Sequence, residues 1–222
     1  MNKFFQLCSL LWTRAVVTKQ QFVDFLMTST TYYGNIKFAK IDLRLLLTYF
    51  WENPFRVSRA YLESTQAKDV YVYGETPLTT LQLICKRAGV TPMDTILELG
   101  CGRGRTCFWL REWLGCKVVG IDQVPEFIEN ANKIKDYFQL DSGIEFVQGD
   151  YLTADWGNPT VVYLYGSNLH ETDIKLLANR MHKLPTGVKV ISVSYPIPGM
   201  KLLRRFQAPF TWGDADVFVQ YL

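Results

Sequence analysis

Residues 96–105 are Ile-Leu-Glu-Leu-Gly-Cys-Gly-Arg-Gly-Arg, and this stretch decides the fold of the chain. A strand-like apolar run leads straight into three glycines at alternate positions, and glycine lets a backbone approach a ligand closely. The spacing Glu-x-Gly-x-Gly-x-Gly differs from the Gly-x-Gly-x-x-Gly of dinucleotide-binding turns and lacks the Lys-Ser/Thr ending of a phosphate-binding loop. We therefore expect a strand-to-helix turn that binds a ligand without phosphates. A tight connection that binds nothing is the alternative.

Strands and helices are predicted to alternate around this turn. Val- and Ile-rich runs predict strands over residues 95–99, 117–121, 144–147, 161–165 and 188–193. A helical pattern over residues 76–88 precedes the first of these strands, and further helical patterns fall between strands, over residues 105–114, 125–140 and 170–184. This alternation predicts an α/β fold with a doubly wound, mostly parallel, Rossmann-like sheet. Two further strands, over residues 203–212 and 216–222 around Gly213-Asp214, predict an antiparallel C-terminal hairpin that completes a seven-strand sheet.

Residues 1–66 are predicted to form a helical extension, with residues 67–222 as the main domain. Turns are expected at residues 33–35 and 53–54. The apolar runs 4–12 and 45–51 are too short to span a bilayer, which takes about 20 residues. Eight Lys or Arg residues face only four acidic ones in this extension. We expect a lid, a substrate-docking element or, through residues 1–51, a membrane-surface element.

Composition excludes several kinds of site. The net charge is only +3, so there is no strong nucleic-acid signal. The five cysteines form no Cys-x-x-Cys pair and there are only two histidines, so we expect neither a metal site nor a disulfide framework. A reducing compartment follows, and we expect a cytoplasmic protein that is free or peripheral to a membrane.

Acidic residues come directly after the first three predicted strands or at their ends. Glu98 precedes the glycine turn, Asp122 follows the second strand and Asp150 follows the third. Ligands of parallel sheets bind beyond the carboxyl ends of the strands. A carboxylate at Asp122 can accept two hydrogen bonds from a ribose diol, and one at Asp150 can accept from an adenine amino group.

This combination resembles the class I methyltransferases that use S-adenosylmethionine, over about residues 70–222. The resemblance implies that the glycine turn surrounds the methionine part of the cofactor, that Asp122 holds the ribose and that Asp150 holds the adenine. The candidate cofactor-binding residues are Tyr73, Glu75, Thr76, Glu98, Gly100, Cys101, Gly102, Gly104, Asp122, Gln123, Gly149, Asp150, Tyr151 and Tyr165.

A finer likeness lies in three segments. Residues 72–76 (Val-Tyr-Gly-Glu-Thr) and 149–152 (Gly-Asp-Tyr-Leu), with Trp156 beyond, resemble loops of the non-SET histone-lysine methyltransferases of the disruptor-of-telomeric-silencing family, and residues 210–213 (Phe-Thr-Trp-Gly) resemble its final hairpin. In that family the first loop covers the cofactor and the tryptophan of the hairpin lines a lysine channel. The chain departs at residues 165–168 (Tyr-Gly-Ser-Asn), where those enzymes carry an asparagine-rich motif. Here it is more similar to the protein-lysine methyltransferases that modify membrane-embedded ATP synthase subunits.

The leading hypothesis is methyl transfer to a protein lysine by in-line displacement. Tyr165, Tyr195 and Trp212 are the candidate catalytic residues, because aromatic walls would remove water from the lysine and favour its neutral amine. The chain singles out no general base. Two alternatives stay open: a small-molecule or RNA methyltransferase on the same scaffold, and an interaction module that binds the cofactor without turnover.

Overall fold

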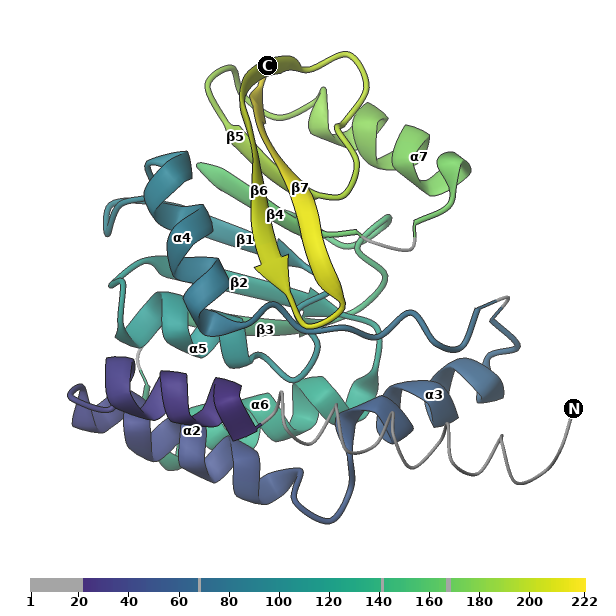
Figure 1. The fold of residues 1–222 in the computed structure, drawn as a ribbon. Helices are drawn as coiled ribbons and strands as arrows, with labels where there is room; N and C mark the ends of the chain where they lie inside the picture. The colour runs from purple at the N-terminus through teal and green to yellow at the C-terminus, as the bar shows by residue number, and fades with distance from the viewer. Residues whose placement is uncertain (1–21, 68, 141, 167–168) are drawn as a thin grey trace, which may run out of the picture.

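The protein folds around one seven-stranded sheet (Figure 1). The computed structural model describes residues 22–67, 69–140, 142–166 and 169–222. The strand order is β3-β2-β1-β4-β5-β7-β6, and only the pairs made by β7 are antiparallel. This confirms the predicted fold class. The strands are β1 (Thr95–Leu99), β2 (Lys117–Asp122), β3 (Ile144–Gln148), β4 (Val161–Tyr165), β5 (Lys189–Val193), β6 (Lys201–Phe210) and β7 (Gly213–Tyr221).

Helices lie where the apolar spacing predicts them, although several are shorter. Helical backbone covers residues 22–32, and Asn35 and Asn53 then cap the next two helices through their side-chain oxygens. The prediction of turns at residues 33–35 and 53–54 is confirmed. The labelled helices are α2 (Ile36–Thr48), α3 (Pro54–Ser64), α4 (Leu78–Ala88), α5 (Arg105–Glu112), α6 (Pro125–Tyr137) and α7 (Glu171–Met181).

Two apolar clusters lie on opposite faces of the sheet. Alternate residues of a strand point to opposite faces, so Ile96 of β1 packs in the cluster with α4, α5 and α6, whereas Leu97 and Leu99 pack in the cluster with α7. The same alternation turns Glu98 toward α5. Helix α2 packs outside α5 and α6, so the first helices form a further layer on that side (Figure 1).

The C-terminal hairpin differs from the sequence prediction in its turn. Phe210 pairs with Gly213, so the turn consists of Thr211 and Trp212 rather than Gly213 and Asp214. Gly213 begins β7 with φ +133°, a backbone conformation that favours glycine. Trp212 therefore stands at the tip of the hairpin and not at the end of a strand.

A buried ion-pair network joins the N-terminal helices to α5. Nε of Arg105 donates to Oδ1 of Asp42 at 2.7 Å, and its Nη1 donates to Oδ2 of Asp24 at 2.8 Å. Tyr33 also donates its hydroxyl to Asp42. Burial alone would lower the pKa of Arg105, but the two carboxylates outweigh it and raise that pKa. The extension is thereby attached to the first residue of the helix that follows the glycine turn. The division into an extension and a main domain at residue 66 stays a prediction.

We expect Asp42→Ala to destabilise the fold by about 3 to 5 kcal/mol, the usual cost of leaving a buried charge without its partner. Asp24→Ala is the matched control, because its side chain is 23 % exposed and water can replace it; it should cost less than half as much. Urea unfolding followed by circular dichroism measures both. Equal losses for the two variants would contradict the burial argument.

Candidate active site

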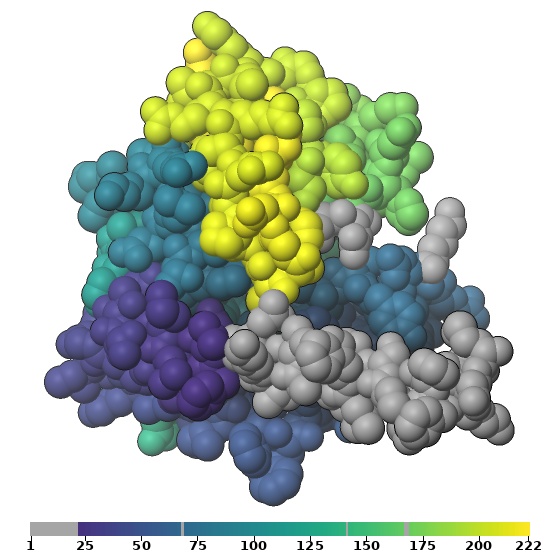
Figure 2. Space-filling view, viewed as in Figure 1, coloured from purple at the N-terminus to yellow at the C-terminus, as the bar shows by residue number. Residues whose placement is uncertain are grey.

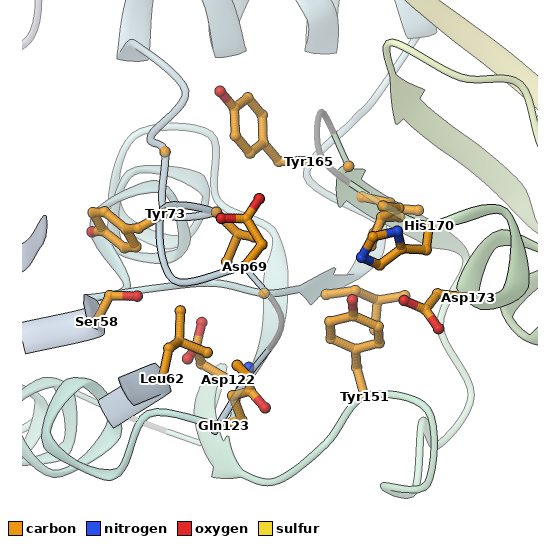
Figure 3. Close-up of a pocket in the computed structure, with 18 of the residues that line it drawn as sticks. Ser58, Leu62, Asp69, Tyr73, Asp122, Gln123, Tyr151, Tyr165, His170 and Asp173 are labelled. Carbon is orange, nitrogen blue, oxygen red and sulfur yellow. The ribbon is translucent and has the colours of Figure 1, made fainter. Parts of the chain in front are cut away.

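The site lies at the carboxyl ends of β1, β2 and β4. A cavity of about 810 Å³ opens there and is lined from these strand ends, from the loop before α4 and from the start of α7. Figure 3 shows Tyr73 and Ser58 on one side of this cavity and His170 and Asp173 on the other. A second, much smaller chamber of about 20 Å³ adjoins it beside the glycine turn. Tyr73, Gly74, Gly100 and Tyr165 line both spaces.

The glycines of the turn are required by the backbone and by close neighbours. Gly102 has φ +54°, and a Cβ there would lie 3.0 Å from the ring of Tyr73. Gly104 has φ +78°, and a Cβ there would lie 2.5 Å from Phe146. Both conformations are rare for residues with side chains. The loop containing Tyr73 can therefore pack directly on the turn.

Asp122 connects this turn to the neighbouring strand. Its Oδ2 accepts the backbone N–H of Gly102 at 2.7 Å, and its Oδ1 accepts that of Val124 at 2.9 Å. Burial raises the pKa of Asp122, although the backbone hydrogen bonds lower it in part. Each carboxylate oxygen has a second lone pair, so the side chain can still accept hydrogen bonds from a ligand in the cavity.

A charged cluster of Arg103, Glu75 and Tyr73 covers the other side of the turn. Arg103 pairs with Glu75 at 2.7 Å, and Tyr73 donates its hydroxyl to the same carboxylate at 2.5 Å. Burial acts to raise the pKa of Glu75, but Arg103 outweighs it, so that pKa lies below its usual value. This charged cluster holds the loop of residues 72–76 over the glycine turn. Sequence analysis singled out Tyr73 and Glu75 but missed Arg103, although it lies within the motif.

Glu98 is buried beneath the turn. It accepts hydrogen bonds from Thr106 Oγ1 at 2.6 Å and from Cys107 Sγ at 3.1 Å. Burial raises the pKa of Glu98 to about 7, against 4.5 for a free side chain, and the two hydrogen bonds only reduce this effect. Glu98 is thus a carboxyl group that loses its proton near neutral pH.

The predicted aromatic residues are only partly brought together. Trp212 donates Nε1–H to the hydroxyl of Tyr165 at 2.7 Å, and Phe210 stacks on Trp212. Tyr165 also packs so closely on Gly74 that a Cβ there would lie 2.8 Å from its ring. Tyr195 is exposed and lines neither space. Trp212 is itself 52 % exposed and lines neither space, so the structure connects it to the site only through Tyr165, and it leaves Tyr195 apart.

The other candidate cofactor residues divide into three groups. Gln123 and Tyr151 line the large cavity with Tyr73, Gly100, Asp122 and Tyr165. Glu75, Thr76, Glu98, Cys101 and Gly102 line the small chamber. Gly104, Gly149 and Asp150 line neither, and Asp150 is exposed with its Oδ1 accepting the N–H of Leu152. The roles assigned to these residues stay predictions. Ser167 and Asn168 lie outside the described residues.

Sequence analysis missed the acidic character of the large cavity. Asp69, Glu171 and Asp173 join Asp122 in its lining, together with His170. None of its described lining residues is Lys or Arg; Lys68 lies outside the described residues. The acidic first turn of α7 was readable from the sequence, but its position opposite Asp69 was not. The cavity therefore favours a cationic ligand.

Comparisons with known proteins agree with this arrangement. Residues 91–158, from just before β1 to beyond β3, match a family model described as a methyltransferase domain. A crystal structure of an RNA methyltransferase from Salinibacter ruber with S-adenosyl-L-homocysteine is similar, with a TM-score of 0.57 and 26 % identity over 66 % of this chain and 92 % of that one. Over residues 91–158, the chain carries a class I S-adenosylmethionine-dependent methyltransferase domain. Its domain is thus that of a methyl-transferring enzyme, with S-adenosylmethionine as cofactor.

Curated relatives of this domain act on different acceptors. The sterol 24-C-methyltransferase of Kluyveromyces lactis is 24 % identical over 61 % of this chain and 35 % of its own length. A histone-lysine N-methyltransferase of Dictyostelium discoideum, specific for lysine 79 of histone H3, is 24 % identical over 73 % of this chain and 9 % of its own length. The chain thus spans about a third of the first of these relatives and a tenth of the second. The family alone leaves the acceptor open.

The residues present fit the cofactor. Gly100 and Gly102 expose backbone to the two spaces, Asp122 offers a carboxylate in the large cavity, and acidic side chains suit a positively charged sulfonium. Among the residues that the structure describes, no group of three or more His, Cys, Asp or Glu side chains could hold a metal ion. No described helix is long and apolar enough to cross a membrane.

Cofactor affinity should depend on Asp122 more than on Asp150. We expect Asp122→Asn to weaken binding of S-adenosylhomocysteine roughly 10- to 100-fold, the cost of one or two hydrogen bonds to a charged group. Asp150→Asn should change it less than about threefold, because Asp150 caps a turn outside both spaces. Titration calorimetry measures both. A larger loss for Asp150 would contradict the placement of the ligand beside Asp122.

The stability of the cofactor-free protein should depend on pH through the carboxyl group of Glu98. The pKa of Glu98 is higher in the folded chain than in the unfolded chain, so its contribution to stability falls as pH rises from about 4.5 to about 7 and is constant above that range. Glu98→Gln removes this loss. The free energy of unfolding of the variant, relative to that of the natural protein, should therefore increase by roughly 2 to 4 kcal/mol between pH 4.5 and pH 8. Thermal and urea unfolding across this range measure the difference. Glu145→Gln, at an exposed position of β3, is the control. A stability difference independent of pH would contradict the assignment.

Proposed function

We propose that the protein transfers a methyl group from S-adenosylmethionine to the side-chain amine of a protein lysine. The observation that carries this proposal is the charge of the large cavity, which four carboxylates line with no described Lys or Arg. An ammonium group is attracted to such a cavity, whereas the phosphates of RNA are repelled. The Dictyostelium histone-lysine enzyme, which matches 73 % of this chain, supports the same acceptor.

The chain's own groups position the acceptor rather than react with it. When bound, the cofactor supplies a methyl group whose carbon–sulfur bond breaks as the new nitrogen–carbon bond forms. The lysine must first lose a proton, since its free pKa is about 10.4. Asp69, Glu171 and Asp173 attract the ammonium, and the ring of Tyr165, whose hydroxyl accepts a hydrogen bond from Trp212, excludes water and favours the neutral amine. His170 also lines the cavity, and its imidazole can accept the released proton.

A small apolar acceptor is the second candidate. A further groove of about 430 Å³ shares Glu75 and Thr76 with the small chamber. Aromatic and aliphatic side chains such as Phe25, Tyr49 and Phe55 line one part of it, and the charged side chains of Arg103 and Arg105 line another. An apolar ring system can bury its surface in such a groove. The sterol methyltransferase of Kluyveromyces lactis supports this class of acceptor.

Methyl-labelled cofactor distinguishes these candidates. Incubated with protein, RNA and lipid fractions of a lysate, the enzyme should label the protein fraction, and hydrolysis should return the label as methylated lysine. Label in the lipid fraction would favour the apolar acceptor, and label in RNA would contradict the charge argument.

Two variants test the proposed acceptor site once a labelled protein is in hand. Trp212→Ala should lower kcat/KM for that protein about tenfold, the value of one aromatic contact and hydrogen bond. Asp173→Asn should raise KM with less effect on kcat, because it weakens attraction of the ammonium. Glu145→Gln, which removes an exposed carboxylate of β3 outside the cavity, is the neutral control. An unchanged KM in Asp173→Asn would contradict a role of the acidic wall in acceptor binding.

A further inference from the structure

Helix α2 exposes a stripe of apolar side chains to solvent. Its inner face buries Phe38, Ile41, Asp42 and Leu45. Its outer face carries Ile36, Leu43 and Leu47, which are 42 to 68 % exposed. Their spacing of seven and four residues places them on one line along the helix. The helix therefore carries apolar side chains on both faces. Packing of its inner face alone does not require the apolar side chains on its outer face.

The stripe continues into the connection between α2 and α3. Phe50 and Trp51 in this connection are 71 % and 88 % exposed. Figure 1 shows the connection projecting at the lower edge of the molecule, and Figure 2 shows α2 and the connection, in blue, at the lower part of the same face. We call Ile36, Leu43, Leu47, Phe50 and Trp51 the α2 surface.

The exposed charges that residues 36–56 carry are mostly positive, although Glu126 of α6 lies near Glu52. Lys37, Lys40 and Arg44 lie on the exposed side of α2, and Arg56 follows in α3. Of the two acidic residues in 36–56, Asp42 is buried against Arg105, which leaves Glu52 as the exposed one. Lys37 does pair with Glu112, and Arg44 lies over the ring of Tyr137, itself an exposed aromatic residue. The surface thus combines exposed aromatic and aliphatic side chains with a net positive border.

We propose that the α2 surface docks on an anionic lipid bilayer. Aromatic side chains such as Trp51 favour the boundary between headgroups and acyl chains, and a helix with an apolar stripe and flanking cations lies flat in that boundary. Lys and Arg can lay their aliphatic stems along the apolar surface while the charge reaches the phosphates. Each cation near such a surface adds to the attraction by anionic headgroups. A nucleic acid would also meet the cations, but it offers no apolar phase for Ile36, Leu43 and Leu47.

Docking in this orientation places the apolar groove at the membrane. Phe50 belongs to the α2 surface and also lines the groove of about 430 Å³, which extends to Glu75, Thr76 and Thr211 beside the glycine turn. If the proposed function holds, the acceptor is thereby presented from a membrane. The docking itself is independent of the reaction and is tested without it.

Vesicle flotation with the full chain tests the docking. We expect binding to vesicles of phosphatidylcholine with phosphatidylglycerol, and much weaker binding to phosphatidylcholine alone. Replacing Phe50 and Trp51 together by Ser should weaken the binding at least tenfold, because the variant loses the burial of two large apolar side chains in the bilayer. Lys40→Glu should weaken binding to the anionic vesicles only. Met93→Ser is the matched control, since Met93 is 89 % exposed in the turn before β1, away from α2.

Unaltered flotation of the Phe50 and Trp51 variant would overturn the proposal. That result would mean that another segment of the full chain, and not the α2 surface, attaches the protein to vesicles. Thermal unfolding checks that the exposed substitutions leave the fold intact. Light scattering examines the other occupant: a mass that doubles with concentration in the natural protein, but not in the variant, would assign the α2 surface to a second copy of the chain and equally overturn lipid docking.

Discussion

The carboxylate of Asp122 accepts two backbone N–H groups, one from Gly102 in the glycine turn after β1 and one from Val124, two residues after the end of β2. A buried carboxylate is costly unless it is hydrogen-bonded, and these two bonds are what make its position tolerable. They tie the ends of two neighbouring strands together where the cavity opens. The start of α5, the floor of the cavity and the position of Gly102 against Tyr73 all depend on this tie.

The two arginines between and after the last glycines extend this organisation in two directions. Arg103 pairs with Glu75 in the loop over the turn, whereas Arg105 pairs with Asp42 in α2. One short segment therefore positions both the cofactor loop and the N-terminal helices. Through Arg105 the N-terminal helices are joined to the first residue of α5, directly after the glycine turn.

Charge is distributed unevenly over this chain of net charge +3. Carboxylates line the large cavity, and cations border the exposed apolar stripe of α2. The first pattern supports a cationic acceptor and the second an anionic surface, and neither is visible in the net charge. The groove between them, lined by Phe50 and Glu75 among others, is the feature on which the two proposals meet.

Local sequence determined the strands, the glycine turn and the class of fold, because apolar periodicity and glycine spacing act through the backbone of adjacent residues. It also put Asp122 at a strand end, but it put Asp150 at a strand end as well and did not distinguish the two as ligand-binding candidates. Only the tertiary structure separated the two, burying the first and leaving the second exposed on a turn. The same holds for Arg105 with Asp42, 63 residues apart, and for Asp69 facing α7. Such pairings arise when the sheet brings distant loops to one edge, and no local pattern encodes which side chains then meet.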